Sequence, residues 1–307
     1  MTASIDSSPA RAQNPGRENG EPVARGVSPR RAMLRAFVGD RLAVVALLVL
    51  ITMGALALLA PVVAPYDPNA QDFSQTLQSP SREHWFGTDD LGRDLLSRML
   101  FGARLSLGAA LIAVTLGAAL GVLPGFLAGY RGGTVDIGLS RLTDAIMCIP
   151  GLILSISLIA VFGPGTLQVA IAVGVAFAPR FFRVARGAAL SVAAETYVKA
   201  VRAAGAGHTR TLLRHVVPNA SSAVIVQASL MFGMGLLVEA GLSFLGFGAQ
   251  PPAASWGALL RRGSGFMVEA RYLSVIPGLV ITIAVLAGNI AGDGLQRAVT
   301  NQRSSGR

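Results

Sequence analysis

Several uninterrupted apolar runs in this sequence are long enough to cross a lipid bilayer. The first extends from Leu42 to Ala64, and at about 1.5 Å per residue a helix of this length covers a hydrocarbon layer of ~30 Å. Charged residues make up only 14% of the 307 residues and hydrophobic residues 52%, whereas a soluble domain has about 25% charged residues. We therefore expect an all-α integral membrane protein. The single cysteine, Cys148, excludes an internal disulfide.

The apolar runs predict six transmembrane helices. The fourth run has only 14 residues, and by length alone it is compatible with a re-entrant segment. The six runs cover residues 42–64, 105–128, 142–162, 165–178, 221–247 and 273–292.

The distribution of Lys and Arg favours counting the fourth run as a span. With six spans and both termini cytoplasmic, the inside segments hold 19 basic residues and the outside segments 7. Without the fourth span the numbers become 12 inside and 14 outside, against the preference of basic residues for the cytoplasmic side.

This topology divides the chain into five parts. We expect a disordered basic cytoplasmic tail (1–41), a first transmembrane helix (42–64), an extracytoplasmic loop (65–102), a core domain with five transmembrane helices (103–296) and a cytoplasmic tail (297–307).

The stretch "TYVKAVRAAGAGHTRTLLRHVVPNA" (196–220) interrupts the apolar runs between the fourth and fifth spans and faces the cytoplasm in this topology. Its first half predicts an amphipathic helix that ends at Gly205 and Gly207, because glycine tolerates the left-handed conformation of a helix end. Thr209 is a candidate N-cap of a second short helix, and Pro218 suits the first turn of the fifth span. The apolar stripe predicted for the first helix contains Leu190, Ala194, Tyr197, Val201 and Ala204.

The residues alone leave two interpretations of this basic loop open. It is either a docking element for another protein or an interfacial helix on anionic lipid. A DNA-binding helix–turn–helix is disfavoured, because the loop is tethered between two spans and is too short for its own core.

The loop resembles the Glu-Ala-Ala motif of permease subunits of binding-protein-dependent ABC importers. Lys199-Ala200-Val201 occupy the first triplet, Gly205 the glycine, and His215, Val217 and Pro218 the end of the motif. Lys199 departs from the usual glutamate. The stretches at 86–107, 144–154, 239–248 and 255–260 resemble the dipeptide, oligopeptide and nickel transport branch of the family, and the first of them resembles its C-type permease.

The resemblance implies that the 190–218 loop is a coupling helix that seats on a separate ATP-binding subunit. The chain has no GxxxxGK[ST] phosphate loop, so ATP and magnesium are expected in partner subunits, with no cofactor, no metal site and no enzymatic activity in this chain. The expected coupling surface contains Lys199, Ala200, Arg202, Gly205, Arg210, Arg214, His215 and Pro218.

The resemblance also implies the remaining partners and the location. These are a second permease subunit, two ATP-binding subunits and an extracytoplasmic solute-binding protein, around a multi-pass protein of the bacterial cytoplasmic (inner) membrane. No nucleic acid is expected. The substrate stays open between a dipeptide, an oligopeptide, a nickel chelate and another small solute.

Two acidic residues in or near the apolar runs are further candidates, since intramembrane charges often mark function. Glu239 either lines the translocation path or bonds another helix, and Asp144 is expected to pair with Arg141 or Arg131 near the interface. An ion-driven secondary transporter is the alternative function, but one embedded glutamate offers little for an ion site.

Overall fold

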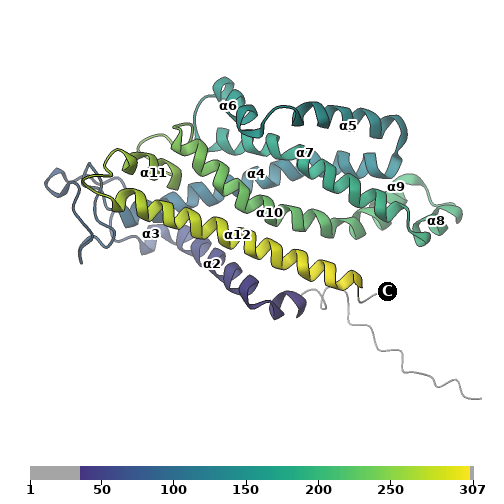
Figure 1. Ribbon diagram of the computed structural model, residues 1–307, viewed down its shortest axis with the longest axis horizontal. Coiled ribbons are helices and arrows are strands. Elements are labelled where there is room, and N and C mark those ends of the chain that lie inside the picture. The colour runs from purple at the N-terminus through teal and green to yellow at the C-terminus, as the bar shows by residue number, and fades with distance from the viewer. Residues whose placement is uncertain (1–34, 305–307) are drawn as a thin grey trace, which may run out of the picture.

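The computed structural model describes residues 35–304, and these residues form helices joined by turns and loops, with no β-sheet among them. Five helices are long and apolar enough to cross a membrane, and a sixth span results if the bent pair α5 and α6 counts as one. The long helices lie side by side, with α8 and α9 at one end of the molecule and α11 at the other (Figure 1). An all-helical membrane fold is therefore confirmed.

The element bounds are as follows. The long helices are α2 (Arg41–Leu58), α4 (Leu95–Arg131), α7 (Thr166–Ala193), α10 (Val217–Phe244) and α12 (Tyr272–Ser304). The shorter elements are α3 (Ala60–Val63), η1 (Phe73–Gln75), α5 (Gly133–Met147), α6 (Gly151–Phe162), α8 (Thr196–Ala203), α9 (His208–Thr211), η2 (Leu212–Val216) and α11 (Trp256–Ser264).

Close packing of α4 against α7 forms the centre of the bundle. A row of glycines on α4 at four-residue spacing brings the two backbones together, and a Cβ atom at Gly121 would lie 2.2 Å from the Ala178 carbonyl oxygen. At Gly129 the corresponding distance to the Arg186 carbonyl oxygen would be 2.3 Å. Small residues allow this approach where lipid provides no hydrophobic driving force between helices.

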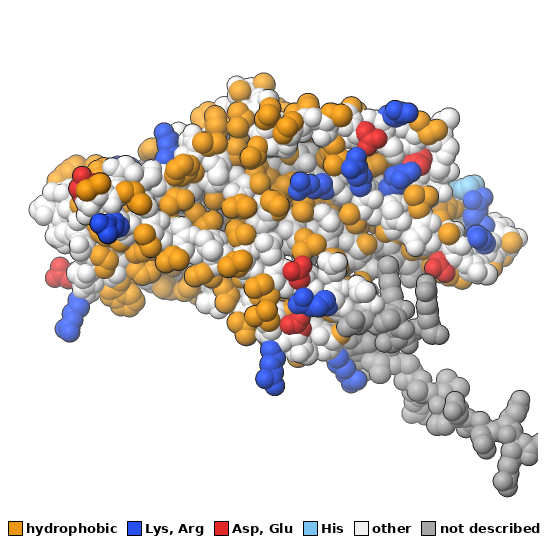
Figure 2. Space-filling model, in the orientation of Figure 1, with side chains coloured by type: hydrophobic (Ala, Val, Ile, Leu, Met, Phe, Trp, Pro, Cys, Tyr) orange, Lys and Arg blue, Asp and Glu red, His pale blue; other side chains and the backbone are white. Residues whose placement is uncertain are grey.

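The outward faces of the long helices carry large apolar side chains. Leu48 of α2, Leu123 of α4 and Val161 of α6 are each more than half exposed, and hydrophobic side chains cover much of the middle of the visible face (Figure 2). Such contiguous apolar surface indicates contact with lipid or with another membrane subunit.

The fourth span is longer than we predicted from its apolar run. The 14-residue run is part of the 28-residue helix α7, which continues through Pro179 and three arginines. The charged side chains do not end the helix, because Arg183 and Arg186 pair with carboxylates of α5 while Phe181, Phe182 and Ala185 pack inside.

The third predicted span is the interrupted one. The chain bends by 84° between α5 and α6, where Pro150 precedes Gly151 and cannot continue a regular helix. The predicted run 142–162 therefore consists of the end of α5 and all of α6.

Two further boundaries differ from the prediction. Helix α4 begins at Leu95 rather than near Leu105, because the Asp94 side chain caps it by accepting the Ser97 N–H at 2.7 Å. Helix α12 continues to Ser304, so most of the predicted 297–307 tail is helical. The predicted disordered tail, residues 1–41, lies outside the described residues up to residue 34. Its remaining part is not disordered, because residues 35–39 are helical and α2 begins at Arg41.

Candidate functional site

The basic segment, residues 195–218, begins with the short helix α8. The chain breaks at Ala194 and Glu195 between α7 and α8. At its other end α8 closes as predicted at Gly205, whose φ is +88°. The Gly205 N–H donates to the Arg202 carbonyl at 3.0 Å and the Ala206 N–H to the Val201 carbonyl at 3.2 Å. This pair of bonds is the Schellman closure, which favours glycine at the left-handed position.

The second half of the basic segment runs without interruption into the fifth span. Helix α9, the wider turn η2 and helix α10 follow one another from His208 to Phe244. The predicted cap at Thr209 is wrong, because Gly207 holds the N-cap position and His208 already begins the helix. Pro218 lies in the first turn of α10, as predicted.

The turn η2 exposes a backbone carbonyl to side-chain donors. The Asn219 Nδ2 donates to the His215 carbonyl at 2.6 Å, and the Tyr197 hydroxyl donates to the same oxygen at 3.5 Å. The Tyr197 bond links α8 to the turn that leads into α10, and the Asn219 bond closes that turn.

The underside of the basic segment is buried against the ends of α4 and α7. Val198, Val216 and Ala220 are at most 1% exposed and pack with Phe126 of α4 and Ala185 of α7. The predicted stripe is wrong in phase: Tyr197 and Leu190 are each more than 40% exposed. The break at Ala194 and Glu195 shifts the helical register, so that Val198 faces inward instead.

The outer surface of the segment is basic. Arg202 Nη2 lies 3.0 Å from His208 Nε2 across the turn that follows α8, and Lys and Arg side chains gather beside histidine at this end of the molecule (Figure 2). His215 is half-buried. The predicted coupling residues that are exposed are Lys199, Ala200, Arg202, Gly205, Arg210, Arg214 and Pro218.

Asp144 forms an ion pair with a different residue from those predicted. Its Oδ1 lies 2.9 Å from Arg183 Nη2 of α7, and both side chains are more than half exposed. The predicted pairing with Arg141 or Arg131 is wrong, because α5 lies along α7.

Glu239 is buried in the bundle, near the C-terminal end of α10. It is 2% exposed and accepts a hydrogen bond from the Ser243 hydroxyl at 2.7 Å. The hydroxyls of Ser106 on α4 and Ser255 before α11 lie close to the same carboxyl group, while no described donor reaches Oε2 with hydrogen-bond geometry. Glu239 therefore lies among hydroxyls of three elements.

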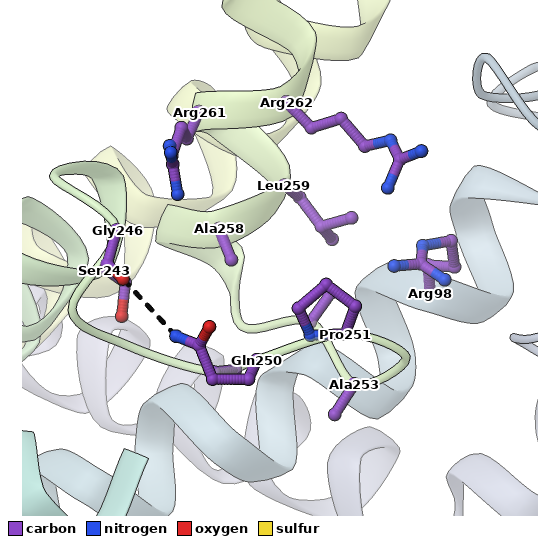
Figure 3. Close-up of a pocket in the computed structure, with 12 residues that line it drawn as sticks. Arg98, Ser243, Gly246, Gln250, Pro251, Ala253, Ala258, Leu259, Arg261 and Arg262 are labelled. Carbon is purple, nitrogen blue, oxygen red and sulfur yellow. Dashed lines mark hydrogen bonds between the residues drawn. The ribbon is translucent and has the colours of Figure 1, made fainter. Parts of the chain in front are cut away.

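A second polar site, absent from the sequence prediction, lies at the end of the molecule near α11. Arg98, Arg261 and Arg262 surround a cavity of about 250 Å³ beside Gln250 and Pro251 (Figure 3). The Arg98 side chain is 4% exposed and its Nη1 donates to the Pro68 carbonyl at 2.9 Å. In the sequence, the adjacent arginines of "LLRRG" indicate a basic site at 261–262. A single sequence does not show that Arg98 lies beside them.

Buried polar contacts hold together the loop before α4, and Asp89 Oδ2 of this loop lies 3.6 Å from Arg98 Nε. Asp89 accepts from Arg93 Nε at 2.8 Å, and His84 Nδ1 lies 2.9 Å from Asp94. Arg93, Asp89 and Asp94 are at most 3% exposed. The described residues contain no cluster of three His, Cys, Asp or Glu side chains that could hold a metal ion.

Comparison with known families is decisive for the chain as a whole. Residues 121–304 match the family described as the binding-protein-dependent transport system inner membrane component. Residues 28–80 match the N-terminal transmembrane domain of oligopeptide transport permease C. The chain belongs to the permeases of binding-protein-dependent ABC importers. It is a multi-pass permease of the bacterial inner membrane, and the peptide branch of the family expected from the motifs is confirmed.

Curated relatives of this permease cover nearly its whole length. It is 39% identical over 282 residues to the glutathione transport system permease protein GsiD of Pectobacterium atrosepticum, a match that covers 91% of this chain and 94% of the relative. It is 37% identical over 279 residues to the dipeptide transport system permease protein DppC of Alkalihalophilus pseudofirmus, with 91% and 92% covered. A GsiD of Escherichia coli is 41% identical over 273 residues, with 89% and 90% covered.

Among solved structures, an amino acid ABC transporter crystallised with histidines is similar to 68% of this permease and to 92% of its own chain. The TM-score is 0.48 and the sequence identity 16%.

Proposed function

We propose that this permease forms half of a translocation path for short peptides, and that a second permease subunit forms the other half. Relatives named for glutathione and for dipeptides both match more than 90% of this chain, which supports a peptide-like solute. The family that matches this chain is described as binding-protein-dependent, which supports a solute-binding protein as a partner. An ion-driven transporter has no comparable support.

In this proposal the basic segment faces the cytoplasm and seats on an ATP-binding subunit. Two such subunits bind ATP and magnesium, so this chain needs no cofactor and catalyses no reaction. Both termini are cytoplasmic, which places the basic segment on the side where Lys and Arg accumulate. The solute-binding protein then docks at the opposite end, near α11 and the loop before α4.

One observation carries the coupling role: α8 ends in a Schellman closure, and its underside packs against α4 and α7. Val198 is buried against their ends while Lys199, Arg202 and Arg210 project outward. Motion of an ATP-binding subunit against this surface would reach the transmembrane helices directly. A helix lying loosely on lipid would not need the Gly205 closure or the packed underside.

The experiment is co-purification with the sister permease and the ATP-binding subunits. Gly205→Pro should release the ATP-binding subunits, because proline fixes φ near −65° and cannot adopt the +88° of Gly205. Gly207→Pro is the matched control, since the φ of Gly207 is −64°. The proposal fails if Gly205→Pro retains the ATP-binding subunits as fully as Gly207→Pro does, with both variants inserted in the membrane.

A further inference from the structure

A cavity of about 560 Å³ opens between α6, α7 and α10, beside the 84° bend that separates α5 from α6. Its walls are mainly apolar, with Leu152 from α6, Phe177 from α7 and Leu237 from α10. Leu152 and Leu237 are more than half exposed, so the cavity opens on a face that other molecules can reach. Arg180 is the charged residue among the described side chains that line it.

Arg180 differs from the next two arginines on α7. Arg183 pairs with Asp144 at 2.9 Å, and the Arg186 Nη2 donates to Asp136 at 2.7 Å. No carboxylate of the described residues pairs with Arg180, whose polar contact is the Met231 sulfur at 4.0 Å. Two arginines are thus neutralised by α5, while the third, beside the bend, is not.

The Arg180 side chain is exposed where it lines the cavity, so an anion from outside can reach it. It lies near the middle of α7, about 21 Å along the helix from Thr166 at 1.5 Å per residue. A guanidinium beside apolar walls is stabilised by an anion, because an unpaired charge next to apolar surroundings is costly. No carboxylate of the described residues pairs with Arg180, so an anion that binds it comes from outside the described part of this chain.

The start of α6 favours an anion in the same cavity. Pro150 holds the N-cap position and no side chain caps the first turn. Gly151 and Leu152, the first two residues of α6, line the cavity. Free N–H groups at a helix start carry a partial positive charge, which adds to the charge of Arg180.

We propose that this cavity binds the carboxylate of the transported peptide, with Arg180 as the positioning cation of the translocation path. The inference rests on the proposed function and names the chemical group of the substrate that this permease recognises. Every short peptide with a free terminus carries such a carboxylate, so one fixed cation suits a path that takes peptides of different side chains. The cavity volume accommodates a peptide terminus.

The test uses the complete importer in proteoliposomes, with its sister permease, ATP-binding subunits and loaded solute-binding protein. Radiolabelled glutathione and radiolabelled dialanine are the two probes. Arg180→Gln should lower ATP-driven uptake at least tenfold, and Arg180→Lys should retain uptake within about threefold of the wild type. Arg183→Gln is the matched control and should also stay within about threefold, because its partner Asp144 is in this chain.

A second readout detects the peptide in the cavity itself. A benzophenone amino acid at Leu237 should cross-link to the labelled peptide during turnover, and Arg180→Gln should weaken this cross-link at least fivefold. An unchanged cross-link and unchanged uptake overturn the proposal. Loss of the sister permease from Arg180→Gln also overturns it, because Arg180 would then pair with an acid of that subunit.

Failure of the proposed function gives a different pattern. If the wild type takes up neither probe, the peptide assignment and this inference both fall. If Gly205→Pro retains its ATP-binding subunits while Arg180→Gln loses uptake, the coupling role alone is wrong. Equal loss of uptake in Arg180→Gln and Arg183→Gln indicates a general disturbance of α7 and contradicts a specific carboxylate site.

Discussion

Arg262 of α11 and Asp90 of the loop before α4 form a two-point ion pair across 172 residues of sequence, with Nη2 and Oδ2 2.8 Å apart. Both side chains are partly buried. The pair joins α11, which lines the cavity of Figure 3, to the loop before α4. It therefore fixes the shape of the end of the permease where we propose that the solute-binding protein docks.

The pair predicts a pH-dependent stability. Burial raises the pKa of Asp90, but the hydrogen bond and charge of Arg262, together with a backbone hydrogen bond and the charge of Arg93, lower it by more, so its pKa lies below the ordinary 3.8. A lowered pKa stabilises the fold above the unfolded value, and this stabilisation is lost as the pH falls through the folded pKa. Asp90→Asn should lower the free energy of unfolding by about 1 kcal/mol at pH 7.

Thermal unfolding in detergent across pH 3–7 measures this effect. The difference between wild type and Asp90→Asn should be constant above about pH 5 and should shrink toward pH 3. Glu83→Gln, an exposed change in the same loop, is the control and should show no such difference. A gap between wild type and Asp90→Asn that widens toward acid pH would contradict the assignment.

The glycine row of α4 predicts a second, purely steric effect. Gly121→Ala should destabilise the permease by about 1–3 kcal/mol, because its Cβ would lie 2.2 Å from the Ala178 carbonyl oxygen. A methyl group at Gly108 on the same helix would meet no atom within 4 Å, so Gly108→Ala should be neutral or slightly stabilising. The midpoint temperatures of thermal unfolding in detergent compare the two variants. Equal midpoints would contradict the close approach of α4 and α7.

Glu239 predicts a contrast between two substitutions. Glu239→Gln keeps the shape and an acceptor for the Ser243 hydroxyl, and it avoids a buried charge, so stability and uptake should change little. Glu239→Ala leaves a cavity and unpaired hydroxyls and should cost about 2–4 kcal/mol. Stability is measured by thermal unfolding and uptake in proteoliposomes. If Glu239→Gln abolishes uptake while the protein stays folded, the carboxylate charge itself takes part in transport.

Charge reversal on the basic segment predicts weaker coupling. Arg214→Glu leaves the fold intact because the side chain is exposed, but it places a negative charge on the proposed contact surface. Co-purified ATP-binding subunit should fall about tenfold. Arg82→Glu, at an exposed position in the loop before α4, should leave it unchanged. An equal effect of both substitutions would mean that net charge, not the contact, is responsible.

The sequence predicted those features that depend on local chemistry. Gly205 ends α8 and Pro218 lies in the first turn of α10, because only a few residue types fit these positions. Hydropathy underestimated the length of α7, because Arg183 and Arg186 reduce its apolar character. These arginines pair with carboxylates of α5, a neighbour that one sequence does not show.

The parts that sequence could not predict depend on long-range neighbours. Nothing local relates Arg262 to Asp90, or places the Glu239 carboxyl near Ser106 and Ser255. The predicted buried face of the basic segment was wrong for a more local reason. A two-residue break before α8 shifts the helical register, so that Val198 is buried in place of Tyr197.

Site-specific cross-linking tests the central claim most directly. The chain has one cysteine, the exposed Cys148, so Cys148→Ser gives a background without thiols. In that background Ala203→Cys, at the end of α8, should cross-link to an ATP-binding subunit in intact membranes, while Ala70→Cys, in the loop before α4, should not. Cross-links from Ala70→Cys but not from Ala203→Cys, or labelling of Ala203→Cys from outside the cell, would contradict a cytoplasmic coupling segment.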